Sequence, residues 1–138
     1  MSAHVDNVPR WVRIAVGILG LLTLAYGVAC YFDINLLFHH ATGIDLTNPS
    51  IKNAGYEFAS RNLAIGVALC FVTIIRGAPE ALTILTIVRA LIEIQTIILS
   101  IVAGNITAML LIPVVLLVVE ILIVKTLIGV IKKEEEAQ

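Results

Sequence analysis

The chain has 138 residues, of which 59% are hydrophobic and 14% are charged, and its formal net charge is −1 at pH 7. Soluble domains carry about a quarter charged residues, and one small soluble core could not enclose this much apolar sequence. The near-neutral charge argues against nucleic acid as a partner, because phosphate binding needs a dense basic surface. We therefore expect most of the chain to be surrounded by lipid.

Four apolar segments are long enough to be membrane-spanning helices. A helix needs about 20 mainly apolar residues to cross the roughly 30 Å hydrocarbon core, and four segments meet this requirement: 14–31, 57–75, 81–102 and 106–130. Gly104-Asn105 is too short to be more than a turn between antiparallel neighbours. The sequence thus predicts an all-α membrane protein, one domain over 1–138, folded as an antiparallel four-transmembrane-helix bundle.

The predicted outer loop, residues 32–56, contains two signals for helix starts. Asp33 precedes a short amphipathic segment, Ile34 to Phe38, which we expect to lie along the membrane interface. Asn48-Pro49 has the residue types of a helix N-cap followed by a first helical position. The second long helix is therefore expected to begin about two turns before Glu57.

The basic residues predict the orientation in the membrane. An even number of spans places most of them on one side: Arg10, Arg13, Arg76, Lys125, Lys132 and Lys133. The only lysine or arginine in the outer loop is Lys52. Because basic residues accumulate on the cytoplasmic side, we predict that both termini are cytoplasmic. Residues 131–138 form the predicted cytoplasmic tail, in which Lys-Lys-Glu-Glu-Glu is expected to be solvated and frayed.

The third span carries ionisable side chains at bilayer depth, where such groups normally face the bundle or water. At 100° per residue, its main polar side chains fall within an arc of about 80°: Thr86, Arg89, Glu93, Thr96 and Ser100. Arg89 and Glu93 are four positions apart and can pair directly. Gln95 points away from this stripe by about 140°.

Two neighbouring spans offer partners for that polar stripe. Glu120 lies near the middle of the fourth span, and Arg61 and Asn62 lie about one turn inside the second. Glu57 and Arg61 repeat the four-residue spacing nearer the outer surface. The sequence predicts a buried polar network, and a candidate ligand-binding site, made of these residues: Arg61, Asn62, Arg89, Glu93, Thr96, Ser100 and Glu120.

This network has two interpretations that the sequence leaves open. It either locks the helices in register, or it forms the polar floor of a cavity for a ligand head group or a proton path.

His39-His40 does not make a metal site, because no third ligand has a recognisable spacing. Small residues, among them Gly20, Gly27 and Gly66, indicate close helix packing within the bundle or at a homodimer face.

The second and third spans resemble the DoxX-like superfamily of small four-helix integral membrane proteins, over roughly residues 55–104. The resemblance rests on Arg61-Asn-Leu-Ala-Ile-Gly66, on Arg76-Gly77, and on an acidic residue in the next span, where Glu93 replaces the aspartate of many members. Membership implies the four-helix bundle. The group includes a subunit of a thiosulfate–quinone oxidoreductase, so it also suggests an accessory role, and it supplies no catalytic residues.

We expect a multi-pass, non-enzymatic protein of a bacterial or archaeal plasma membrane, with no cofactor, catalytic residue or metal of its own. The first functional hypothesis is binding of an amphiphilic ligand, a quinone or a lipid, or docking of a partner membrane protein or a second copy of the chain. The alternatives are a proton or small-ion pathway, and an accessory subunit of a quinone-linked oxidoreductase.

Overall fold

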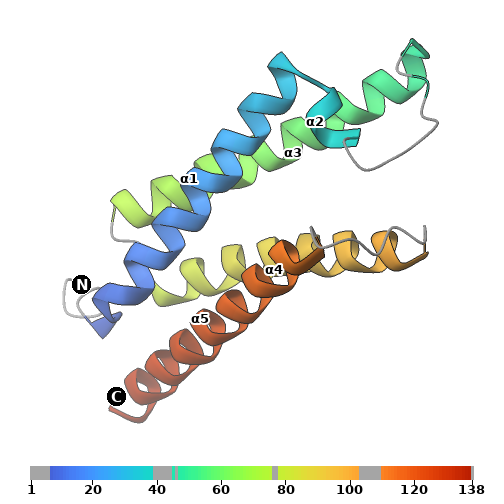
Figure 1. Ribbon diagram of the computed structural model, residues 1–138. Coiled ribbons are helices and arrows are strands. Elements are labelled where there is room, and N and C mark those ends of the chain that lie inside the picture. The colour runs from blue at the N-terminus through green and yellow to red at the C-terminus, as the bar shows by residue number, and fades with distance from the viewer. Residues whose placement is uncertain (1–6, 39–44, 46, 76–77, 103–109, 138) are drawn as a thin grey trace.

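The computed structural model describes residues 7–38, 45, 47–75, 78–102 and 110–137. Within these residues the chain forms four long helices and one short helical turn (Figure 1): α1 (Arg10–Phe32), α2 (Asn35–Phe38), α3 (Pro49–Ile74), α4 (Pro79–Val102) and α5 (Leu111–Glu136). Each long helix is long and apolar enough to cross a membrane. The all-helical class and the four candidate spans are thus confirmed.

Both predicted helix starts in the outer loop are confirmed. Asn48 caps α3, because its side-chain oxygen accepts a hydrogen bond from the backbone N–H of Ser50 at 3.0 Å, and Pro49 takes the first helical position. Asp33 holds the start of α2, where its Oδ1 accepts from the backbone N–H of Asn35 at 3.0 Å. Capping of this kind satisfies N–H groups that have no partner within the helix.

Proline also positions the starts of α4 and α5. Pro79 is the first residue of α4, and Glu80 places a negative charge in its first turn, which the helix dipole favours. Pro113 lies in the first turn of α5, where the missing N–H costs no intrahelical hydrogen bond.

The predicted frayed tail is wrong over most of its length, because α5 continues through Glu136. Lysine and glutamate are good helix formers. Lys133 lies in the last turn, where a positive charge interacts favourably with the helix dipole. Several predicted features lie outside the described residues: His39-His40, Arg76-Gly77, the Gly104-Asn105 turn and residues 106–109 of the fourth span.

The long helices pack as two pairs, α1 with α3 and α4 with α5 (Figure 1). Glycines bring α1 and α3 together. A Cβ atom built on Gly27 would lie 2.8 Å from the backbone nitrogen of Leu63, and one built on Gly66 would lie 2.5 Å from that of Leu24. Real side chains do not approach this closely, so these glycines allow close packing within the chain. Of the two predicted roles, packing within the bundle and a homodimer face, the structure shows the first.

The apolar core joins the two pairs and contains residues from all four long helices. Its buried members are Val8, Val12, Val16, Leu19, Leu69, Leu82, Ile123 and Leu127. Val8 precedes α1, and the other residues come from the first half of α1, the start of α4, and the later parts of α3 and α5. At the same end of the bundle, Asn7 Nδ2 donates a hydrogen bond to Glu134 Oε1 at 3.0 Å.

Candidate functional site

Helix α4 turns two of its charged residues, Arg89 and Glu93, toward the other helices. Arg89 is 6% exposed and Glu93 is 7% exposed, and Thr86 on the same face is also buried. Gln95, which the helical period places on another face, is exposed. The predicted stripe therefore faces the bundle over its first two turns.

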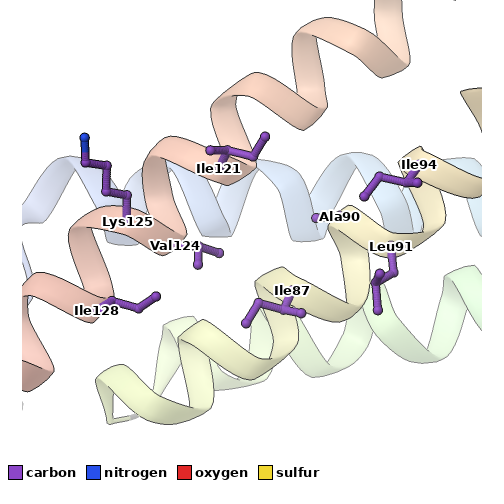
Figure 2. Close-up of a pocket in the computed structure, with 8 residues that line it drawn as sticks. All are labelled: Ile87, Ala90, Leu91, Ile94, Ile121, Val124, Lys125 and Ile128. Atoms are coloured by element: carbon purple, nitrogen blue, oxygen red, sulfur yellow. The ribbon is translucent and has the colours of Figure 1, made fainter.

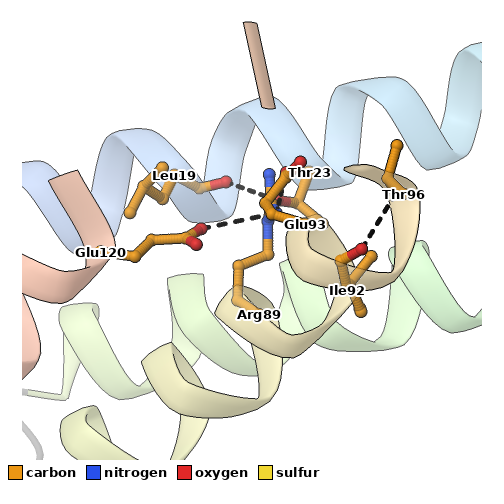
Figure 3. Close-up of polar contacts among 7 residues, drawn as sticks. All are labelled: Leu19, Thr23, Arg89, Ile92, Glu93, Thr96 and Glu120. Atoms are coloured by element: carbon orange, nitrogen blue, oxygen red, sulfur yellow. Dashed lines mark hydrogen bonds and ion pairs between the residues drawn. The ribbon is translucent and has the colours of Figure 1, made fainter. Parts of the chain in front are cut away.

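The Arg89 guanidinium joins three helices (Figure 3). Its Nη1 donates to Glu93 Oε1, one turn further along α4, and lies 3.4 Å from Glu120 Oε1 on α5. Its Nε donates to the hydroxyl of Thr23 on α1 at 2.7 Å. We call Thr23, Arg89, Glu93 and Glu120 the buried polar network.

Glu120 is the deepest member of this network. Its side chain is fully buried, and among the described residues neither of its carboxyl oxygens has a hydrogen-bond partner. Its polar contact is the ion pair with Arg89. Two carboxyl groups therefore share one guanidinium, so the position of Glu120 depends on Arg89.

Thr23 is the network residue that the sequence analysis missed. Its hydroxyl donates to the carbonyl of Leu19 on its own helix at 2.7 Å and accepts from Arg89. A hydroxyl that bonds back to its own helix still has lone pairs with which to accept. The available signal was the position of Thr23 in the middle of a charge-free apolar span.

Arg61 does not belong to the network, and this part of the prediction is wrong. Its side chain is 75% exposed and pairs with Glu57, one turn earlier on α3, with 3.9 Å between Nη2 and Oε2. The pairing of Arg61 with Glu57 is confirmed, but the pair is exposed and does not lie in the interior. The buried face of α3 contains Gly55, Ala59, Asn62, Gly66 and Leu69, and Arg61 lies to the side of it.

The other predicted members bond within their own helices. Asn62 is buried, and its Nδ2 donates to the carbonyl of Phe58 at 3.1 Å. Thr96 and Ser100 are half-buried, and their hydroxyls donate to the carbonyls of Ile92 and Thr96. These three residues line the interior without joining the Arg89 ion pairs.

An apolar groove of about 380 Å³ lies between α4 and α5 (Figure 2). Eight residues line it: Ile87, Ala90, Leu91, Ile94, Ile121, Val124, Lys125 and Ile128. We call it the α4–α5 groove. Its walls are hydrocarbon and include the aliphatic stem of Lys125, whose charged end points away from the other lining side chains (Figure 2).

The groove and the network occupy different faces of α4. At 100° per residue, the α4 residues of the groove point about 130° away from the direction shared by Arg89 and Glu93. On α5, Glu120 is buried while its neighbour Ile121 lines the groove. The ion pair between Arg89 and Glu120 therefore ties together the two helices that form the groove walls.

The site contains no candidate metal centre in the part of the chain that the structure describes: no three His, Cys, Asp or Glu side chains there are grouped to hold an ion. Cys30 and Cys70 are free thiols. Compared with known proteins, the chain matches no family model, no curated protein and no solved structure.

Proposed function

We propose that this protein is a multi-pass membrane protein whose four long helices cross the bilayer as an antiparallel bundle. The helices have 23 to 26 residues, enough for the roughly 30 Å hydrocarbon core. Large apolar side chains are exposed on each of them, such as Ile18, Phe71, Leu91 and Leu122. The antiparallel arrangement is supported by α1 and α3, where Gly20 faces Cys70 and Gly27 faces Leu63.

The proposed orientation places both termini in the cytoplasm of a bacterial or archaeal cell. Its support is the basic sequence at the two chain ends, with Arg10 and Arg13 at the start of α1 and Lys132 and Lys133 at the end of α5. The hydrogen bond between Asn7 and Glu134 is consistent with both ends lying at one membrane surface. The DoxX-like relationship is part of this proposal and rests on the residues quoted for it.

The proposed function is binding of an anionic amphiphile, a lipid whose acyl chain lies in the α4–α5 groove and whose head group contacts Lys125. The observation that carries this function is the groove itself, which is apolar along its walls and includes the aliphatic stem of Lys125, whose ammonium group points away from the other lining side chains (Figure 2). Lys125 lies seven residues before Lys132, about 10 Å along the helix. A flexible lysine side chain can bring its charge toward the head-group region from that depth.

The charge, and not the hydrocarbon, gives this site its selectivity. Acyl chains are already in an apolar medium, so moving one into the groove gains packing contacts but little hydrophobic free energy. A lysine near an anionic head group contributes about 1 kcal/mol, which corresponds to about a fivefold change in affinity. The buried polar network supports this function by holding α4 against α5.

The test uses protein released from nanodiscs that contain equal amounts of phosphatidylglycerol and phosphatidylcholine, measured by native mass spectrometry. The wild type should retain one phosphatidylglycerol in preference to phosphatidylcholine. Lys125→Gln should reduce that preference about fivefold, while Lys132→Gln, on the same helix but outside the groove, should leave the single retained lipid in place. Equal retention by the wild type and Lys125→Gln would show that the groove does not select an anionic lipid.

A neutral quinone would give a different result, namely a bound mass that Lys125→Gln does not change. The ion-pathway and accessory-subunit alternatives stay predictions.

A further inference from the structure

The outer face of α4 carries a regular seam of exposed side chains. Its members follow one another at steps of four, three, four, three and four residues: Ile84, Val88, Leu91, Gln95, Ile98 and Val102. All six are exposed. By the helical period, the seam lies about 180° from the buried face that contains Leu82, Thr86, Arg89 and Glu93. We call it the α4 seam.

Gln95 is the polar member of this otherwise apolar seam. Its amide has two N–H donors and an acceptor oxygen, and among the described residues it has no hydrogen-bond partner. On the proposed topology it lies at bilayer depth, where water is absent and an unsatisfied amide costs free energy. An amide in that position is stabilised by a polar group on another helix.

The pattern of the seam matches one kind of partner, a second copy of α4. Alternating steps of three and four residues are the spacing of a left-handed helix pair, with Val88, Gln95 and Val102 in one set of layers and Ile84, Leu91 and Ile98 in the other. A single polar side chain in such a seam fixes the register of the pair. Because an amide both donates and accepts, two glutamines can satisfy each other.

The membrane fixes the geometry of that pair. Copies of one chain insert with the same orientation, so a two-fold axis relating them runs along the membrane normal, and their α4 helices run parallel. Equivalent residues then face each other across the axis. We propose that the α4 seam is the interface of a parallel homodimer, in which Gln95 forms hydrogen bonds with Gln95 of the second copy.

This interface is compatible with the α4–α5 groove. Leu91 belongs to both surfaces, but the other groove residues of α4, Ile87, Ala90 and Ile94, point about 80° away from the seam. The dimer proposal rests on the proposed membrane-spanning arrangement and not on lipid binding. The two proposals can therefore fail separately.

The first measurement is the dissociation constant of the dimer in liposomes, from energy transfer between labelled copies of the full chain. Hydrogen bonds between membrane helices contribute about 0.6–1.7 kcal/mol, so Gln95→Leu should weaken dimerisation about three- to twentyfold. Gln95→Asn, which retains an amide, should dimerise more tightly than Gln95→Leu. Because Gln95 faces outward, circular dichroism should show the same helix content in all three proteins.

The second measurement locates the interface by disulfide cross-linking in membranes, with Cys30 and Cys70 replaced by serine. Val88→Cys and Ile98→Cys should each form a covalent dimer, whereas Leu122→Cys, on the exposed face of α5, should not. A monomeric wild type, an unchanged dissociation constant in Gln95→Leu, or cross-linking at Leu122→Cys in place of the seam would overturn the dimer. Retention of phosphatidylglycerol that depends on Lys125 would then show that the proposed function stands without it.

Discussion

Arg89 is the residue on which the interior of the bundle depends, because one guanidinium contacts two buried carboxyl groups and a hydroxyl from three different helices. Burying ions costs free energy that their mutual attraction only partly offsets, so a complete buried ion pair contributes little net stability. Removing one member is different, since it leaves the others buried without compensation. Arg89 therefore affects stability most when it is lost alone.

This difference gives the prediction at the residue scale. Arg89→Leu should lower the free energy of unfolding by about 3–5 kcal/mol, because Glu93 and Glu120 would remain buried without their cation. Replacing Arg89, Glu93 and Glu120 together by leucine should restore most of the loss, because all the buried charges go at once. Unfolding by sodium dodecyl sulfate in mixed micelles measures the free energy of unfolding of the single and the triple variant. A single variant as stable as the wild type would contradict the contacts assigned to Arg89.

The sequence predicted part of this network from spacing. Arg89 and Glu93 lie four positions apart, and their pairing follows from helix geometry. Glu120 was expected because an acidic residue in the middle of a span needs a partner. Arg61 was assigned wrongly because spacing along α3 does not determine how that helix is rotated against α1. Thr23 was missed because a hydroxyl within an apolar helix usually bonds its own backbone.

At the scale of helices, the close approach of α1 and α3 depends on glycine at particular positions. A methyl group at Gly66 would meet the backbone of Leu24, which cannot move without displacing α1. Gly129 on α5 has nothing within 4 Å of the place where a Cβ would be. Both residues are helical glycines, but only Gly129 has room for an added Cβ atom.

Gly66→Ala should therefore destabilise the bundle by about 1–3 kcal/mol, as overpacking of a tight contact usually does. Gly129→Ala is the matched control and should be neutral or up to about 1 kcal/mol more stable, because alanine is the better helix former. The same unfolding assay in mixed micelles compares them. If Gly66→Ala is as stable as Gly129→Ala, the close contact between α1 and α3 is not present in the folded protein in micelles.

Local sequence signals predicted the helix starts better than the helix ends. Asn48-Pro49 and Asp33 act through side-chain geometry over two or three residues, and the structure places both as expected. The end of α5 was predicted too early, because a run of charges was taken as a solvated tail. Charged residues that leave the membrane can stay helical, and Lys132 and Glu136 have the spacing that supports this.

At the scale of the whole molecule, composition predicted that lipid surrounds the chain, because too few polar residues are available to cover a soluble core. The lengths of the apolar segments then predicted the all-helical class and four candidate spans. The α4–α5 groove could not be predicted in the same way. It depends on the rotation of two helices about their axes and on the space between them. Neither quantity is encoded in the hydropathy of either helix.

The proposed orientation makes a prediction for intact cells. In a variant without Cys30 and Cys70, a membrane-impermeant maleimide added from outside should label Lys52→Cys, which lies exposed in the first turn of α3. It should label Glu136→Cys, at the end of α5, only after the cells are permeabilised, since the basic flanks of α1 and α5 favour the cytoplasmic side. The opposite labelling pattern would place the termini outside.

The central claim is that the α4–α5 groove holds the acyl chain of an anionic lipid, and filling the groove tests this most directly. Ala90 lines the groove on α4, whereas Ala64 is an exposed alanine on α3, outside it. Native mass spectrometry should show one retained phosphatidylglycerol on the wild type and on Ala64→Phe, and none on Ala90→Phe. If Ala90→Phe has the helix content of the wild type and still retains the lipid at the wild-type level, the groove is not the binding site.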